Sequence, residues 1–125
     1  MRRLIQVIDD GDDDRHMLRR VFEREGFEVW EAPNGAVALR QLLASEVLPA
    51  LILVDFKMPV INGQEFLEAV AKHHRFRNIF VVVVTGWDID DPRFKYPVMR
   101  KPVPPEKLLL LAHQACTSGH PPCKA

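Results

Sequence analysis

Short apolar runs alternate along the chain with segments in which apolar residues recur every three or four positions. The apolar runs have the length and the β-branched character of strands that are buried on both faces. They cover residues 4–8, 27–30, 51–54 and 79–84, and residues 98–100 are a candidate for a short fifth strand. The first run ends on Asp9 and Asp10, and the third ends on Asp55.

The segments between these runs predict amphipathic helices over residues 13–25, 36–45, 64–73 and 105–115. Asp12 is a suitable N-cap for the first helix, and Gly26 is a suitable stop after it. The positions expected to face the core are Met17, Leu18, Val21 and Phe22 in the first helix and Val37, Leu39, Leu42 and Leu43 in the second.

Residues 87–96 lack helical periodicity, and prolines stand at positions 92 and 97. Proline removes a backbone donor and clashes inside a helix, so we expect a loop or a single turn here. Amide protection of a multi-turn helix across this segment in hydrogen exchange would contradict that expectation.

Strands that alternate with helices predict an α/β fold, a doubly wound parallel sheet with helices on both faces. Right-handed crossovers place the C-terminal ends of all strands on one edge, where such sheets bind ligands. We expect one domain over residues 1–116 and a flexible tail over residues 117–125, which contains glycine and prolines.

The 125 residues include 17 Lys plus Arg and 17 Asp plus Glu, so the formal net charge is zero. This balance argues against a dedicated nucleic-acid-binding module. No apolar run approaches the ~20 residues of a membrane span, and the first run stops too early for a signal peptide, so we expect a cytoplasmic protein. Cys116 and Cys123 lack the spacing of a zinc site and are expected to be free thiols.

Polar residues stand where four of the strands end: Asp9 and Asp10, then Asp55, Thr85 and Lys101. Two like charges ~4 Å apart repel by about 4 kcal/mol at an effective dielectric of ~20. A cluster of three carboxylates therefore needs a cation, and oxygen ligands favour Mg²⁺ or Mn²⁺. An activated Asp, a metal ion and a nearby ammonium group are the equipment for phosphoryl transfer to a carboxylate.

Each of these residues also has an ordinary structural interpretation. Asp9 or Asp10 could cap the following helix, Asp55 and Thr85 could belong to turns, and Lys101 could be solvated surface. Their occurrence together, in strand order, is what indicates a site.

Four motifs carry a resemblance to the receiver domains of bacterial response regulators. They are Val7-Ile8-Asp9-Asp10, the run from Asp55 through Met58-Pro59 to Gly63, Val84-Thr85-Gly86, and Lys101-Pro102. The resemblance extends from about Leu4 to Ala115. It implies the flavodoxin-like sheet order 2-1-3-4-5.

The resemblance also implies roles for single residues. Asp55 is the expected phosphoacceptor, Thr85 the switch hydroxyl, and Lys101 the cation that pairs with the phosphoryl group. Asp10 is expected to bind Mg²⁺ directly and Asp9 through water, with Asp55 and the backbone carbonyl of Lys57 as further ligands. Pro102 is expected to follow a cis peptide bond.

The expected phosphodonor is a histidine kinase or a phosphotransfer protein, and an output partner of unspecified identity would read the phosphorylated form. Such a domain is not a classical enzyme, and we expect a monomer or a weak dimer. Two alternatives remain open. One is a degenerate receiver that acts as an interaction module without phosphorylation. The other is a small aspartyl-phosphate hydrolase, although Lys57 occupies the position where its acid/base Asp would be expected.

Two features depart from the family pattern. The interval from Thr85 to Lys101 is shorter than usual, so the helix before the fifth strand is expected to be shortened or absent, and dimerisation through it is not expected. Val98 stands where the family places an aromatic switch residue. Trp87, Phe94 or Tyr96 could replace that ring, but we favour the interpretation that these aromatics cover core left bare by the lost helix.

Lys57 lies two residues after the expected acceptor, facing the path by which water would attack the acyl phosphate. We therefore predict that Lys57→Ala changes the lifetime of the phosphorylated domain. The decay of the phosphorylated variant, followed by intact mass, would be unchanged if this idea were wrong.

Overall fold

A computed structural model describes residues 3–56, 61–86 and 95–118. Its five parallel strands form one sheet in the order β2-β1-β3-β4-β5, as expected. The strands are β1 (Leu4–Ile8), β2 (Glu28–Ala32), β3 (Leu51–Phe56), β4 (Phe80–Thr85) and β5 (Val98–Arg100). The helices are α1 (Asp12–Arg24), α2 (Gly35–Ala44), α3 (Ile61–Lys72) and α4 (Pro105–Ser118), with a 3-10 turn at His74–Phe76.

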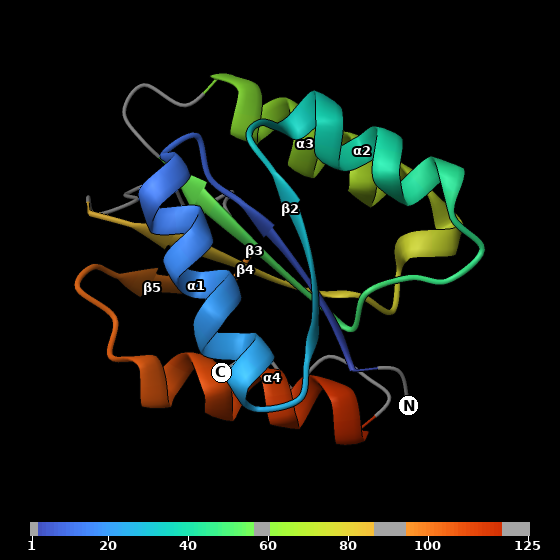
Figure 1. Cartoon of the computed structure of the whole chain (residues 1–125). Coiled ribbons are helices and arrows are strands. Elements are labelled where there is room, and N and C mark those ends of the chain that lie inside the picture. Colours follow the sequence, from blue (N-terminus) through green and yellow to red (C-terminus); the bar gives the residue numbers. More distant parts are fainter. Residues whose placement is uncertain (1–2, 57–60, 87–94, 119–125) are drawn as a thin grey trace.

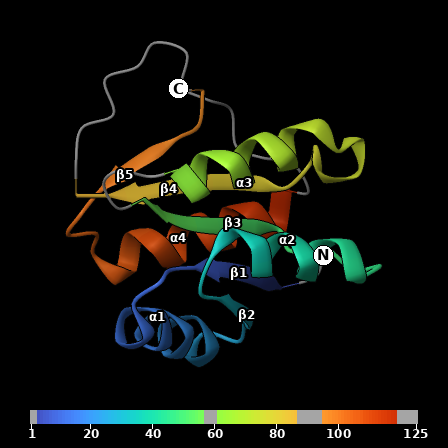
Figure 2. The same cartoon turned by 90° about the horizontal axis from the view of Figure 1, so that it is seen from above.

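The sheet lies between two helical layers (Figures 1 and 2). Helices α2 and α3 cover one face, and α1 and α4 cover the other. The residues of β1 and the first four residues of β3 and β4 are buried, because both of their faces are covered. Two apolar clusters result. One includes Ile52, Val54 and Val83 with Phe66 and Leu67 of α3. The other contains Leu53 and Val82 with Phe22 of α1 and Leu108 of α4.

Alternation along the strands decides which face of the sheet each end residue occupies. Asp55 stands two residues after Leu53, so it lies on the face covered by α1 and α4. Thr85 stands two residues after Val83 and lies on the face covered by α3. The strand ends therefore present these two side chains on opposite faces of the same edge.

Several predicted boundaries are corrected by the structure. Asp12 is the first residue of α1 instead of its cap; Gly11 is the N-cap residue, and no side chain caps this end. Helix α3 begins at Ile61, three residues earlier than expected. Helix α4 continues to Ser118, into the segment expected to be a tail, whose remaining residues lie outside the described part. Each shift is at a helix end, where apolar periodicity carries least information.

Two residues expected to face the core are largely exposed. The exposed fraction is 52% for Met17 and 51% for Leu43. Ala38 and Leu42 supply the buried face of α2, because the helix presents a narrower apolar stripe to the sheet than the number of its apolar residues suggests.

The connection between β4 and β5 falls mostly outside the described residues, since residues 87–94, including Trp87 and Phe94, are not described. In the described part of this connection, residues 95–97 contain no helix. Tyr96 packs against the cluster shared with α3, and its hydroxyl donates a hydrogen bond to the Leu67 carbonyl at 3.3 Å. Burial raises the pKa of this hydroxyl. Tyr96 thus covers core beside β4, as expected for an aromatic in this connection.

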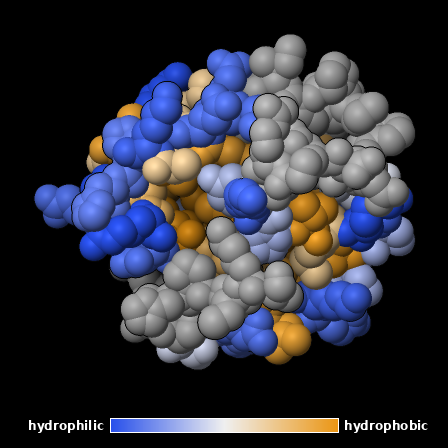
Figure 3. Space-filling model, turned by 180° about the vertical axis from the view of Figure 1, so that it is seen from behind, coloured by the Kyte–Doolittle hydropathy of each residue, from blue (hydrophilic) through white to orange (hydrophobic). Residues whose placement is uncertain are grey.

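The edge of the sheet formed by β5 lies at the rear of the molecule in Figure 1, as the view from above shows (Figure 2). Apolar surface reaches the solvent between hydrophilic residues on this rear side (Figure 3). Val98, on β5, is 39% exposed. An aliphatic residue on an exposed edge is therefore found where the family would place its aromatic switch.

Tyr96 gives a test of this covering role. We expect Tyr96→Phe to lower the free energy of unfolding by about 1 kcal/mol through loss of one hydrogen bond. Tyr96→Ala should lower the free energy of unfolding more, by about 2–3 kcal/mol, because the contacts of the ring are also lost. The loss stays below that of a fully buried aromatic because Tyr96 is only partly buried. Urea unfolding measures both, and Lys95→Ala, at the exposed neighbouring position, is the control. Equal stability of wild type and Tyr96→Ala would show that the ring contributes nothing.

None of the helices in the described ranges combines the length and apolar character needed to cross a membrane.

Candidate functional site

The C-terminal edge of the sheet gathers charged residues from three strands. Asp9 follows β1 directly and is only 4% exposed. Its backbone N–H donates to the Ala32 carbonyl at 3.1 Å, which extends the pairing of β1 with β2 by one step. Its Oδ1 accepts a hydrogen bond from the Gly11 N–H at 2.8 Å. Asp9 is therefore held in a fixed turn at the start of α1, and the exposed Asp10 follows it in the same turn.

Asp55 is paired with Lys101, which directly follows the edge strand β5. It lies within β3 instead of after it, and its side chain is 5% exposed. The Lys101 Nζ is 2.8 Å from its Oδ1. The backbone N–H of Lys101 donates to the Thr85 carbonyl at 2.8 Å, which continues the pairing of β5 with β4, and the Lys101–Pro102 peptide bond is cis, as expected. The sheet thus places the ammonium group directly at the carboxylate.

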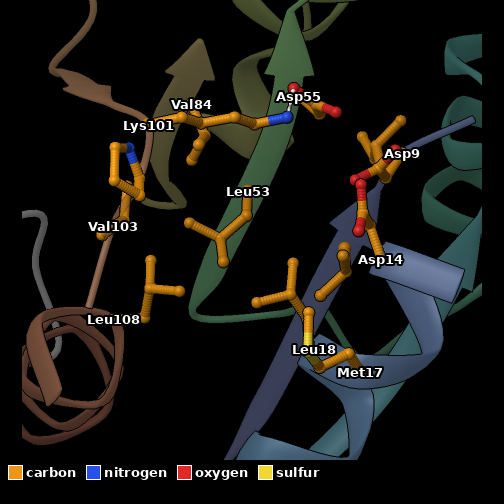
Figure 4. A pocket seen from close by; sticks show the side chains of 13 residues that line it. Asp9, Asp14, Met17, Leu18, Leu53, Asp55, Val84, Lys101, Val103 and Leu108 are labelled. Carbon is orange, nitrogen blue, oxygen red and sulfur yellow. Dashed lines mark ion pairs between the residues drawn. The ribbon is translucent and has the colours of Figure 1, made fainter. Parts of the chain in front are cut away.

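One pocket joins these groups (Figure 4). Its volume is about 440 Å³, and Asp9, Asp14, Asp55 and Lys101 form its charged part. The rest of its lining is apolar and comes from β1, β3, β4, α1, the loop after β5 and α4; it consists of Val7, Ile8, Met17, Leu18, Leu53, Val84, Pro102, Val103 and Leu108. A carboxylate–ammonium pair therefore stands at the rim of an apolar cavity between α1 and α4.

The structure brings together some of the predicted site residues and not others. Asp9, Asp55 and Lys101 border the pocket, whereas Asp10 and Thr85 are not among its lining residues. Thr85 is buried at the end of β4, opposite Phe56 in the register, on the other face of the sheet. Lys57 lies outside the described residues.

The side chains at this edge fit a hard cation. Within the described ranges, no group of three or more His, Cys, Asp or Glu residues is gathered as a ready-made metal site. Mg²⁺ does not need one, because it is usually held by one or two carboxylates together with water and phosphate oxygens. Carboxylate oxygens at Asp9, Asp10 and Asp55 are the donor type that Mg²⁺ or Mn²⁺ prefers.

Arg15 and Glu31 form a second ionic group behind the Asp9 turn, which reasoning from the sequence missed. The Arg15 Nε donates to Glu31 Oε1 at 3.0 Å, and the Arg19 Nη1 donates to Glu31 Oε2 at 2.8 Å. Burial raises the pKa of the Glu31 carboxyl, but the hydrogen bonds from Arg19 and Arg15 and the nearby His16 outweigh burial, so its pKa is below the ordinary value of 4.5. Isolated charges on a helix face give no sequence signal of such pairing.

A separate polar network, between β1 and α2, does have a signal in the sequence, which is a polar residue inside an apolar strand. Gln6 stands in the apolar run of β1, is fully buried, and donates to the Ala38 carbonyl and to Gln41 Oε1. Gln41 donates in turn to the Glu31 carbonyl at 2.8 Å. Because buried polar groups need partners, Gln6 predicts a polar network behind β1 and β2.

The lowered pKa of Glu31 predicts an effect of pH on stability. A carboxyl whose pKa is lower in the folded than in the unfolded chain stabilises the fold above the unfolded pKa, and this stabilisation is lost as the pH falls through the folded pKa. We therefore expect the free energy of unfolding of wild type to fall more steeply below about pH 4.5 than that of Glu31→Gln. Urea unfolding between pH 7 and pH 3 measures this difference. Parallel curves for the two proteins would contradict it.

A family model for the response regulator receiver domain matches residues 5–109. The chain is 34% identical over 83 residues to the sensor histidine kinase CheAY of Helicobacter pylori, covering 66% of this chain and 10% of that protein. It is 32% identical over 87 residues to sporulation initiation phosphotransferase F of Bacillus subtilis, covering 70% of this chain and 67% of that protein. The chain thus spans about a tenth of the length of CheAY.

The fold also resembles solved structures. One is the response regulator protein TrrA of Thermotoga maritima in complex with Mg²⁺-BeF, with a TM-score of 0.75, 22% identity, and coverage of 92% of this chain and 99% of that chain. At 22% identity this similarity shows the fold alone, and the family of the chain is shown by the family model. Since that model covers most of the chain, the protein belongs to the response regulator receiver domain family of two-component signalling.

Proposed function

We propose that this receiver domain accepts a phosphoryl group on the Asp55 carboxylate in a Mg²⁺-dependent reaction and changes conformation to signal. The observation that carries the proposal is the pair at the pocket rim. The Asp55 side chain is 5% exposed, with the Lys101 ammonium 2.8 Å away. A buried carboxylate beside a cation and a second acid, Asp9, is the arrangement that phosphoryl transfer to an aspartate requires.

In the proposed reaction an Asp55 oxygen attacks the phosphorus of a phosphohistidine. The new P–O bond forms as the P–N bond breaks, and the imidazole leaves with the electron pair of that bond. Lys101 donates to a phosphoryl oxygen and offsets the charge gathered there. Mg²⁺, when bound, supplies further positive charge beside the transferred group.

Asp10 and Asp9 are the proposed protein ligands of that ion, Asp10 directly and Asp9 through water, with Asp55 and the Lys57 carbonyl completing the set. The complex of TrrA with Mg²⁺-BeF, in a protein of the same fold, supports the proposal that this domain binds Mg²⁺. Thr85 is the proposed switch hydroxyl. From its buried place at the end of β4 it would hydrogen-bond a phosphoryl oxygen after a change of conformation.

The proposed phosphodonor is a histidine kinase or a phosphotransfer protein, in the cytoplasm. The family assignment and the similarity to CheAY, a sensor histidine kinase, support this partner class. The proposed role is that of a reversible phosphoacceptor and not of an enzyme that turns over a small substrate. Phosphorylation converts the singly charged Asp55 carboxylate into a phosphoryl group of about −1.5 to −2 charge at pH 7, beside the Lys101 ammonium that already pairs with Asp55. This change in charge at the rim is enough to bias a two-state element.

Intact mass spectrometry tests the proposal. Wild type is incubated with acetyl phosphate and Mg²⁺, and in parallel with EDTA in place of Mg²⁺. One added phosphoryl group in the first sample and none in the second is the expected result. Absence of any adduct with acetyl phosphate and with a phosphorylated kinase domain would instead favour a receiver that acts without phosphorylation.

A further inference from the structure

Arg15 is a cation buried behind the Asp9 turn, with an exposed fraction of 8%. Its guanidinium donates three hydrogen bonds to three different parts of the chain. The Nη1 donates to the Asp9 backbone carbonyl at 2.8 Å, the Nη2 to Asp12 Oδ1 at 2.7 Å, and the Nε to Glu31 Oε1 at 3.0 Å. One side chain thus connects the end of β1, the first turn of α1 and the edge strand β2.

The turn that Arg15 contacts carries Asp9 and Asp10. Backbone bonds fix one side of it: Asp9 N–H to the Ala32 carbonyl at 3.1 Å, and Arg15 N–H to the Gly11 carbonyl at 2.9 Å. The Asp9 carbonyl points the other way, toward the guanidinium. Since the peptide that bears this carbonyl also bears the N–H of Asp10, the orientation of that peptide sets the directions in which both acids project.

We propose that Arg15, held by Glu31, is a positioning residue that fixes the Asp9–Asp10 peptide and so prepares the two acids for a divalent cation. This inference rests on the proposed function, because it assigns the two acids to metal binding. Arg15 itself does not contact the pocket. It acts through the Asp9 carbonyl, as groups behind metal ligands commonly do.

The shape of the guanidinium is essential to this role. Its planar fork carries donors on three separate nitrogen atoms, each facing a different acceptor, whereas a lysine has all three donors on one nitrogen atom. Arg19 offers a matched control on the same partner. It donates to Glu31 Oε2 and to Glu23 and is half exposed.

The test measures Mg²⁺ affinity directly, by following the amide signals of Gly11 and Asp55 in NMR spectra during a titration with MgCl₂. We expect Arg15→Met to weaken Mg²⁺ binding about ten-fold or more, the range seen when a group behind a metal ligand is removed. Arg15→Lys should recover only part of the loss. Arg19→Met should change the affinity by less than about two-fold, because Arg15 keeps its own hydrogen bonds to the Asp9 carbonyl and to Glu31 Oε1 when Arg19 is removed.

A second control separates positioning from general loss of stability. Ile79→Val shortens a buried side chain next to β4, at the opposite end of that strand from Thr85, and lowers the stability of the fold without touching the Asp9 turn. Its Mg²⁺ affinity should equal that of wild type. Faster amide exchange at Gly11 in Arg15→Met, but not in Ile79→Val, would locate the change in the turn.

The outcomes distinguish the two proposals. If wild type neither binds Mg²⁺ nor takes a phosphoryl group, the proposed function fails. If wild type does both and folded Arg15→Met binds Mg²⁺ as tightly, the positioning role of Arg15 is wrong while the proposed function stands. A loss of affinity in Ile79→Val equal to that in Arg15→Met would likewise overturn the positioning role.

Discussion

Asp55→Asn is expected to abolish the phosphoryl adduct that wild type forms with acetyl phosphate and Mg²⁺. The substitution keeps the size of the side chain in a place where it is 5% exposed, so the fold should tolerate it. It replaces the charged nucleophilic oxygen by a neutral amide, which does not attack phosphorus at a useful rate. It also leaves the Lys101 ammonium without the carboxylate that lies 2.8 Å away.

Intact mass after a fixed incubation measures the result, and the adduct should fall below detection. Asp13→Asn is the matched control, because it makes the same chemical change at an exposed position in the first turn of α1. It should form the adduct to the same extent as wild type. An adduct of equal yield on Asp55→Asn would place the acceptor elsewhere, and peptide mapping would identify it.

The edge that carries Asp55 follows from the sequence for a simple reason. Strands buried on both faces are nearly continuous apolar runs, so a charged residue marks where burial ends. Asp9 and Lys101 were predicted at this edge by that rule and by the single hand of the crossovers. The order of the strands and the cis bond before Pro102 rested on the resemblance to a family, and the structure confirms both.

The rest of the site depends on distances between side chains that no periodic pattern encodes. Alternation along β4 places Thr85 on the face away from the pocket. This placement could be worked out only once the structure had given the bounds of the strand. The three contacts of Arg15 join residues up to 16 positions apart. Charged residues on a helix face look alike in sequence whether they are solvated, as Arg20 is, or buried, as Arg15 is.

In the connection before β5, too, the sequence predicted the local structure but not the contacts between side chains. The prolines and the missing periodicity argued against a full helix there, but they did not decide which aromatic covers the exposed core. The contact of the Tyr96 hydroxyl with the Leu67 carbonyl supplies that answer for the described residues. This hydrogen bond joins residues 29 positions apart, so it is a tertiary contact that local propensity does not predict.

Lys101→Met is expected to slow phosphoryl transfer about 10²- to 10³-fold without abolishing it, the cost typical of removing one donor aimed at developing charge. The methionine keeps most of the length of the side chain, so the change removes mainly the ammonium group 2.8 Å from Asp55. The nucleophile and the proposed metal ligands remain, and the adduct should therefore still form slowly. Rates come from intact mass at successive times with acetyl phosphate and Mg²⁺.

Lys101→Met should raise the affinity for Mg²⁺ although it slows phosphoryl transfer. Removing a positive charge from the rim where Asp9 and Asp55 lie strengthens the attraction of these acids for a cation. Slower transfer combined with tighter Mg²⁺ binding separates the role of Lys101 from that of Asp55, whose loss removes a proposed ligand as well as the nucleophile. Lys107→Met, at an exposed position of α4, should change neither quantity. If Lys101→Met reacted at the wild-type rate, the ammonium group would have no part in transfer and its pairing with Asp55 would be structural.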